Sequence, residues 1–112
     1  YPDIVVRRGG EAVLIIDTKW KRLSAATSDS KQGVGQSDVY QMMAYAQVYQ
    51  CPNLMLLYPH HSGLDVDEGV LASYRVGGTP DTRLNVATLS VGDWRSVGPR
   101  LLNIVRATGT LS

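Results

Sequence analysis

The chain has 112 residues, of which 44% are hydrophobic, and eleven basic against ten acidic side chains give it a formal net charge of +1. This length allows a single domain, residues 1–112, that is large enough to bury a core. The near-zero charge excludes a strong basic field, so any grip on nucleic acid must be local or supplied elsewhere.

The cysteine content and the start of the chain are also informative. A single cysteine, Cys51, excludes an internal disulfide. With neither a signal peptide nor a long apolar span in the sequence, this favours the reducing cytoplasm and no membrane contact. The sequence opens on Tyr1 without an initiator methionine and enters a strand pattern almost at once. We therefore expect an N-terminally truncated piece of a longer protein.

Two β-patterns come first, at residues 4–8 and 12–20, and the turn between them contains Gly9 and Gly10. A glycine pair between β-branched runs is typical of a hairpin. The second run is continuously apolar before its end, which is typical of a strand that is buried on both faces.

Acidic and basic side chains stand at the open end of this hairpin. If the strands pair in simple register about the two glycines, Asp3 lies beside Asp17. Alternate strand residues share a face, so Asp17 and Lys19 point the same way. Two carboxylates beside a lysine form a metal site suited to phosphodiester hydrolysis.

A helical pattern covers residues 37–49, with Ser37 as its expected N-cap. Its apolar stripe consists of Val39, Met42, Met43, Ala46 and Tyr49. Asp38, Gln41 and Tyr45 form a second stripe at positions i, i+3 and i+7. The helix therefore has a polar face that is available for a site.

The remaining chain gives weaker patterns. We expect a mobile loop at residues 24–35, a buried strand at 54–58, further strands at 70–76 and 84–91, and a last helix at 94–107. Asp93 is the expected cap of that helix, and Gly98-Pro99 is expected to break or kink it. The strand, helix and strand order predicts a crossover connection and hence an α/β fold.

Three of these features together resemble a known superfamily. Pro2-Asp3, Asp17-Thr18-Lys19 on the second hairpin strand, and Gln41 with Tyr45 on the next helix resemble the PD-(D/E)xK nucleases and their RecB-like branch. Four segments are more narrowly similar to the C-terminal part of the McrC family of methylcytosine-dependent restriction components: residues 2–5, 14–21, 38–42 and 56–59. The resemblance covers roughly the first half of the chain. It implies a restriction-endonuclease-like core, a mixed sheet whose hairpin carries the acids, with flanking helices.

The resemblance also implies a metal site. Asp3 and Asp17 would be ligands of Mg²⁺, and the backbone carbonyl of Thr18 would be a further ligand. Hard oxygen ligands with water completing an octahedron suit Mg²⁺, and Mn²⁺ is a possible substitute.

The same resemblance assigns roles to three further side chains. Lys19 would orient or activate the attacking water and offset the charge that builds on the phosphate. Gln41 and Tyr45, one helical turn apart, would position the site or contact the DNA backbone.

The implied function is Mg²⁺-dependent hydrolysis of DNA by the nuclease domain of a McrC-like restriction component, whose partner would be a McrB-like GTPase. One departure from the superfamily pattern matters. Its core has a helix before the first acidic strand, often with another acidic residue, and this helix is absent from the chain. The isolated chain can therefore be folded yet inactive.

Two other functions remain open. One is a non-catalytic module of the same fold that binds DNA or a partner subunit, which the near-neutral charge favours. The other is a sheet-edge fragment whose segment 94–107 docks on the rest of its parent.

Some features also have plainer interpretations. Asp17 and Lys19 alone would be an ordinary surface salt bridge. His60 and His61 are expected to be solvent-exposed rather than metal ligands. The acidic residues Asp65, Asp67 and Glu68 are expected to form a solvated turn. Trp20 and Trp94 are expected to be core or interface residues rather than base-stacking platforms.

Overall fold

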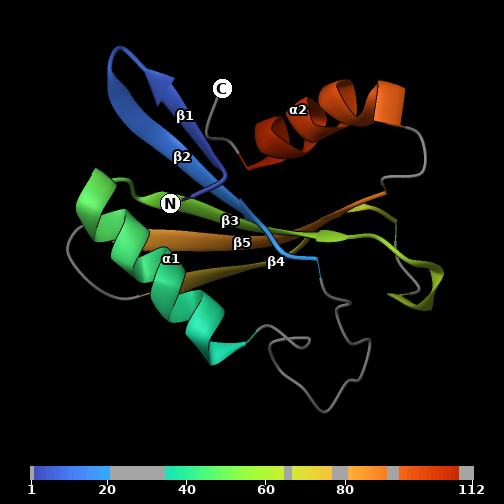
Figure 1. Ribbon diagram of the computed structural model, residues 1–112, viewed down its shortest axis with the longest axis horizontal. Coiled ribbons are helices and arrows are strands. Elements are labelled where there is room, and N and C mark those ends of the chain that lie inside the picture. Colours follow the sequence, from blue (N-terminus) through green and yellow to red (C-terminus); the bar gives the residue numbers. More distant parts are fainter. Residues whose placement is uncertain (1, 21–34, 65–66, 77–80, 91–93, 109–112) are drawn as a thin grey trace.

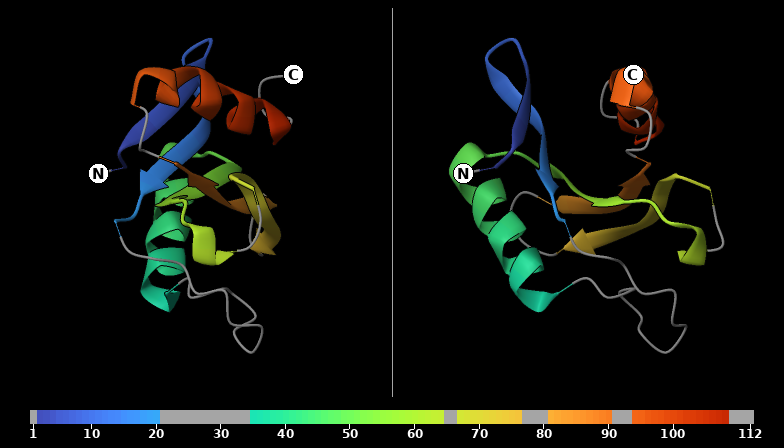
Figure 2. Two further views of the ribbon diagram at one scale, coloured as in Figure 1. Left: turned by 90° about the vertical axis from the view of Figure 1, so that its right-hand side faces the viewer. Right: turned by 45° about the vertical axis from the view of Figure 1, so that its right-hand side comes forward.

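The structure is a computed structural model that describes residues 2–20, 35–64, 67–76, 81–90 and 94–108. Five strands form one mixed sheet, and two helices cover its opposite faces (Figures 1 and 2). The elements are β1 (Ile4–Arg8), β2 (Glu11–Thr18), α1 (Gln36–Tyr49), β3 (Asn53–Pro59), β4 (Gly69–Val76), β5 (Thr82–Leu89) and α2 (Val97–Ala107). Single 3-10 turns occupy Ser62–Leu64 and Trp94–Ser96. The expected α/β class is confirmed.

The sheet has the strand order β1-β2-β3-β5-β4. Strands β2, β3 and β5 are parallel, whereas the two edge strands β1 and β4 run antiparallel to their neighbours. Helix α1 makes the expected crossover from β2 to β3. The carboxyl ends of the three parallel strands therefore lie along one edge of the sheet, where open α/β sheets bind their ligands.

The apolar run of β2 is explained by its place in the sheet. Ile15 packs with Met42 of α1 on one face, and Leu14 packs with Ile104 of α2 on the other. All four side chains are buried. Because both faces of β2 are covered, its sequence needs apolar residues at successive positions rather than at alternate ones.

The register of the β1–β2 hairpin differs from the simple one that the sequence predicts. Gly9 and Gly10 have φ angles of 59° and 85°, as a two-residue turn requires, and Arg8 pairs with Glu11 beside them. The register then shifts between Val6 and Arg7, because β2 carries one extra residue there, a β-bulge. Ile4 consequently pairs with Ile16.

This bulge decides which face Asp3 shares. Simple register about the glycines would place Asp3 opposite Ile16, on the face away from Asp17. The shifted register ends with Ile4 opposite Ile16, and continued by one residue it would place Asp3 opposite Asp17. Asp3 does contact Asp17. The expectation that the two acids are neighbours is confirmed, but the simple register that was to bring them together is wrong.

The helix termini also differ from expectation. Helix α1 begins at Gln36 with Gly35 as its N-cap, so Ser37 lies inside the first turn and is not the cap. Gly98 and Pro99 lie in the first turn of α2 and do not break it, because proline is tolerated where no intrahelical N–H bond is needed. Ser96 is the N-cap of α2, and the expected cap, Asp93, lies outside the described residues. Among the described residues, no helix is long and apolar enough to cross a membrane.

Candidate active site

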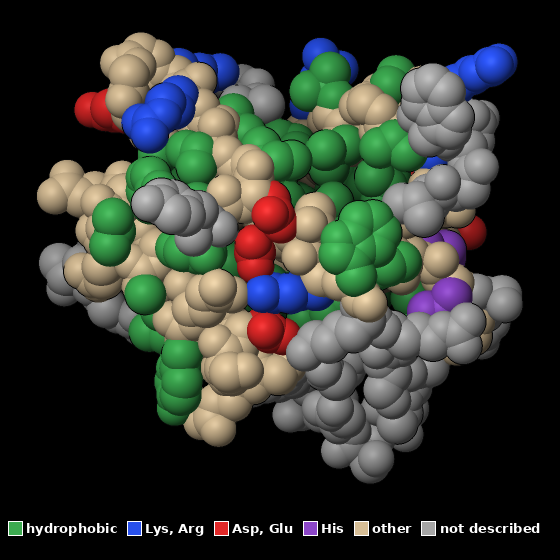
Figure 3. All heavy atoms as spheres, viewed as in Figure 1, with side chains coloured by type: hydrophobic (Ala, Val, Ile, Leu, Met, Phe, Trp, Pro, Cys, Tyr) green, Lys and Arg blue, Asp and Glu red, His purple; other side chains and the backbone are tan. Residues whose placement is uncertain are grey.

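Four of the predicted site residues, Asp3, Asp17, Lys19 and Gln41, meet at the carboxyl end of β2. On the face shown in Figure 3, a Lys/Arg side chain lies between acidic side chains in a column near the centre, with hydrophobic side chains close by. Contacts among the described residues identify this cluster as Asp3, Asp17, Lys19, Asp38 and Gln41. Most of the expected loop at residues 24–35 lies outside the described residues.

Asp17 is the buried centre of the cluster. Only 5% of the residue is exposed, and its Oδ2 lies 2.7 Å from Nζ of Lys19. The strand pattern continues past Thr18, since the N–H of Lys19 donates to the Leu57 carbonyl at 2.9 Å. Asp17 and Lys19 therefore share the α1 face of the sheet, as expected. An ordinary surface salt bridge is excluded by this burial.

Lys19 is held by three acceptors, which matches the three protons of an ammonium group. Besides Asp17, its Nζ contacts Oε1 of Gln41 at 2.8 Å and Oδ1 of Asp38 at 3.5 Å. Burial alone would lower the pKa of Lys19, but the hydrogen bond and charge of Asp17 and the charge of Asp38 raise it above its usual value. Lys19 is therefore a fixed cation at neutral pH, and not a base.

Asp3 approaches the cluster from the end of β1. Its Oδ2 accepts hydrogen bonds from the Thr18 backbone N–H at 2.8 Å and from the Thr18 hydroxyl at 2.6 Å. The hydroxyl bond and then the backbone bond lower the pKa of Asp3, and Asp17 is close enough to contribute. Both bonds use Oδ2, so Oδ1 is the oxygen that faces no donor within the described residues.

The peptide between Thr18 and Lys19 also contributes an oxygen. Its N–H points to β3, where it meets Leu57. In a trans peptide the carbonyl points the opposite way, so the Thr18 carbonyl points away from β3. The N–H of Thr18 points to the same side, toward Asp3. The Thr18 carbonyl and the Asp3 carboxylate thus lie on one side of β2, as the expected ligand set requires.

Tyr45 and Tyr58 lie beneath this cluster. Tyr45 packs against the core on the α1 face, and burial followed by the nearby charge of Asp17 raises its pKa. Tyr58 is 1% exposed, and its hydroxyl has no hydrogen-bond partner among the described residues. Burial, with the charges of Asp38 and Asp17, raises its pKa too. Both phenols therefore keep their protons at neutral pH.

Two participants were not expected from the sequence. Asp38 was noted on the polar stripe of the helix but was not assigned to the site, although its i, i+3 spacing to Gln41 is a signal that identifies it. Its place in the first turn of α1 suits a carboxylate, because the N-terminus of a helix carries partial positive charge. Tyr58 lies two residues after Leu56, the β3 residue that pairs with Asp17. Only the pairing of β2 with β3 shows that Tyr58 is near the site.

The cluster offers oxygen donors that suit a hard divalent cation. Among the described residues, the carboxylates of Asp17 and Asp38 form ion pairs with Lys19, and the carboxylate of Asp3 lies beside Asp17. No group of three His, Cys, Asp or Glu side chains among these residues could hold a metal by itself. The carboxylates of Asp3 and Asp17 and the Thr18 carbonyl could together supply three oxygens, and Mg²⁺ is commonly bound by one or two carboxylates with water as the remaining ligands.

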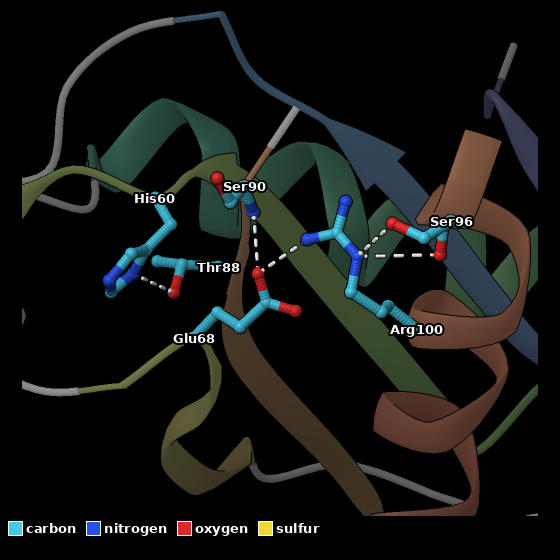
Figure 4. Close-up of polar contacts among 6 residues, drawn as sticks. All are labelled: His60, Glu68, Thr88, Ser90, Ser96 and Arg100. Atoms are coloured by element: carbon cyan, nitrogen blue, oxygen red, sulfur yellow. Dashed lines mark hydrogen bonds and ion pairs between the residues drawn. The ribbon is translucent and has the colours of Figure 1, made fainter. Parts of the chain in front are cut away.

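A second polar cluster lies on the α2 side of the sheet (Figure 4). Oε1 of Glu68 accepts from Arg100 Nη1 at 2.7 Å and from the Ser90 backbone N–H at 3.0 Å. Nε of Arg100 donates to the hydroxyl of Ser96 at 3.0 Å. Glu68 therefore links the start of β4 to the end of β5 and to α2. It does not belong to a solvated turn, contrary to expectation; Asp65 lies outside the described residues.

The two histidines are only partly exposed. Nδ1 of His60 lies 2.9 Å from the hydroxyl of Thr88, which is buried at the end of β5 (Figure 4). The expected solvent-exposed pair is thus wrong in its exposure. That the pair is not a metal site stays a prediction.

The chain was compared with models of known protein families, and a match covers its N-terminal half. The family model of the McrBC 5-methylcytosine restriction system component matches residues 1–59. The chain belongs to this family. The match spans all the predicted site residues and also Asp38 and Tyr58, and it confirms the expected McrC-like restriction component at family level. No curated protein and no solved structure matches the chain.

Proposed function

We propose that the chain is a Mg²⁺-dependent DNA endonuclease domain of the PD-(D/E)xK type, acting within its restriction system. The observation that supports this proposal is the meeting of two carboxylates beside a fixed ammonium: Asp3, just before β1, contacts Asp17 of β2, and Lys19 is held by Asp17 and Gln41. Two carboxylates in contact cost stability unless a cation is bound, so their closeness favours a metal site over a structural salt bridge.

In this proposal Asp3, Asp17 and the Thr18 carbonyl hold the metal. When bound, Mg²⁺ lowers the pKa of a coordinated water and polarises a phosphoryl oxygen. Each of the two carboxylates is held in one orientation by a second residue. Thr18 holds Asp3, and Lys19 holds Asp17. Such support holds ligands in place before the ion arrives.

Lys19 places a positive charge next to the scissile phosphate. With a raised pKa, it stays protonated and stabilises the negative charge that develops on the phosphoryl oxygens, and it orients the attacking water by donating a hydrogen bond. Gln41 and Asp38 keep its Nζ in place from the α1 side. Tyr45 lies beneath as a neutral phenol and supports the position of α1. DNA is the substrate, and a McrB-like GTPase is the partner.

The deciding experiment compares two chemically identical changes in the two polar clusters. Asp17→Asn removes a carboxylate from the site, and Glu68→Gln removes one from the Glu68–Arg100 pair. Mn²⁺ binding by the chain is measured by titration calorimetry, and DNA cleavage is measured with the McrB-like partner and GTP. We expect Asp17→Asn to abolish Mn²⁺ binding and to slow cleavage at least about a hundredfold, since even the loss of groups that only support metal ligands costs 10-fold to 100-fold. Glu68→Gln should change neither.

Full cleavage by Asp17→Asn would overturn the proposal. If the unaltered protein neither binds Mn²⁺ nor cleaves DNA, yet binds DNA or the partner equally well with and without Asp3 and Asp17, the chain is a non-catalytic module of the same fold.

A further inference from the structure

Trp20 directly follows Lys19 and is 78% exposed. Of the two expected positions, core or interface, this exposure excludes the core. A tryptophan carries more apolar surface than most side chains, and on average it is highly buried. An exposed indole at the rim of a site therefore offers a large, rigid contact surface to whatever binds there.

A small hollow of about 40 Å³ lies next to this indole. Its lining is largely apolar and includes Trp20, Leu57, Pro59 and Leu89, with Lys19 at its border. Thr18, Pro59 and Leu89 are the last residues of β2, β3 and β5. The hollow is thus at the carboxyl edge of the parallel strands, beside the acidic cluster, and Figure 3 shows hydrophobic side chains bordering that cluster.

The chemistry of this edge fits one nucleotide better than an apolar peptide. The acidic cluster with Lys19 accepts a metal-bound phosphate, and the indole of the adjacent residue offers a flat apolar face. A nucleotide has a matching pair of groups, because its phosphate and its planar base are joined by a sugar. The phosphate matches the cluster at Lys19, and the base matches the indole. The hollow is too small for a whole base, so the base would lie across its mouth and against the indole.

We propose that Trp20 is a stacking platform for one unpaired or extruded nucleobase, on a nucleotide next to the phosphate bound at Asp3, Asp17 and Lys19. This inference rests on the proposed function. Bases inside a duplex are already stacked on both faces, so only an unpaired or extruded base can cover the indole. A chain with a net charge of +1 gains little affinity from phosphate neutralisation, and stacking supplies affinity of another kind.

Tryptophan fluorescence tests this directly. The chain has two tryptophans, so Trp94→Phe leaves Trp20 as the sole reporter. This variant is titrated with single-stranded oligothymidine and with a blunt duplex of the same length, both in EDTA so that no metal or cleavage contributes. We expect saturable quenching by the single strand and weaker quenching by the duplex. Equal quenching by both, or none by either, would overturn the proposal.

Binding measurements with matched variants separate stacking from general apolar contact. Trp20→Leu should weaken single-strand binding roughly fivefold to a hundredfold, the range measured when a stacking aromatic is removed. Trp20→Phe should retain most of the affinity. Tyr40→Leu is the control, because Tyr40 is another exposed aromatic residue but lies on α1 outside the hollow. Equal weakening by Tyr40→Leu would contradict a specific platform.

The failure of this inference can be told apart from failure of the proposed function. Asp17→Asn in the Trp94→Phe background should lose cleavage but keep the quenching. If the parent protein cleaves DNA but the fluorescence of Trp20 is not quenched, only the stacking proposal is overturned. Quenching without any cleavage by the unaltered protein would overturn the nuclease and leave a base-binding surface.

Discussion

The two polar clusters lie near the same edge of the sheet but differ in their charge balance. On the α2 side, one carboxylate, Glu68, meets one guanidinium, Arg100; the Ser90 N–H also bonds Glu68, and the Ser96 hydroxyl also bonds Arg100. On the α1 side, the carboxylates of Asp17 and Asp38 form ion pairs with Lys19, and Asp3 lies beside Asp17. Among the described residues, the first cluster pairs one acid with one base, whereas in the second the acids outnumber the base.

This difference separates a structural role from a chemical one. A balanced pair that is about one quarter exposed holds α2 against β4 and β5 and needs nothing more. Carboxylates that lie close together are unfavourable by themselves, and proteins keep such arrangements chiefly where a ligand or a reaction uses them. Substitutions in the first cluster should therefore change stability, and substitutions in the second should change activity.

Lys19→Met should have the largest effect, because Lys19 contributes both to stability, as the cation of Asp17, and to the proposed cleavage. The buried Asp17 loses the only cation that contacts it among the described residues. We expect the free energy of unfolding to fall by about 3 kcal/mol, as for other broken buried ion pairs, and cleavage to fall at least about a hundredfold. Urea unfolding and a cleavage assay measure the two effects. A stable variant that still cleaves DNA would contradict the assignment.

Arg100→Met tests the first cluster. It leaves Glu68 bound to the Ser90 N–H but without its cation. Since both side chains are about one quarter exposed, the expected loss in the free energy of unfolding is smaller, about 1–2 kcal/mol. Cleavage per folded molecule should be unchanged. A loss of activity without a loss of stability would mean that this cluster also serves the reaction.

Tyr58→Phe should have an opposite effect on stability and activity. The hydroxyl of Tyr58 is buried with no hydrogen-bond partner among the described residues, so its removal should raise the free energy of unfolding by about 1 kcal/mol in the absence of divalent ions. Because this hydroxyl lies near the charges of Asp17 and Asp38, we also expect slower cleavage. Thermal unfolding with and without Mn²⁺ checks the first part. Destabilisation without the metal would show that the hydroxyl is satisfied.

The smallest effect concerns pH. Hydrogen bonds from Thr18 lower the pKa of Asp3 below its ordinary value of 3.8, so the folded state binds this proton less readily than the unfolded state does. The stabilisation by Asp3 should be complete above about pH 5 and should be lost as the pH falls below 3.8 and through the lowered pKa. Asp3→Asn should flatten this part of a urea-midpoint profile. Thr18→Val, which removes only the hydroxyl bond, should flatten it partly.

Local patterns were enough to predict most elements. The glycine turn, the continuous apolar run of β2 and the polar stripe of α1 each report a local property of the chain, and the structure confirms all three. Two features are set by contacts between distant segments. The parallel pairing of β3 with β2 decides that Tyr58 lies at the site edge. The partner of Glu68 lies on α2, and no spacing within the sequence indicates it.

Capping shows a different limit. Ser37 has the preferred chemistry of an N-cap, yet Gly35 takes that place and makes no side-chain bond. The competing demand is visible in the site: starting the helix at Gln36 lets Asp38 and Gln41 reach the ammonium of Lys19. Tertiary contacts here outweigh a local preference that is typically worth about 1 kcal/mol.

Because of the extra residue in β2, the two acids share a face only if the number of residues between them has the right parity, odd or even. Asp3 and Asp17 are separated by an even number of positions, and a two-residue turn alone pairs residues whose separation is odd. The bulge supplies the missing step. Insertions or deletions in this hairpin should therefore be tolerated in pairs, which keep both acids on one face, while a single-residue change would turn one acid to the opposite face and separate the two carboxylates.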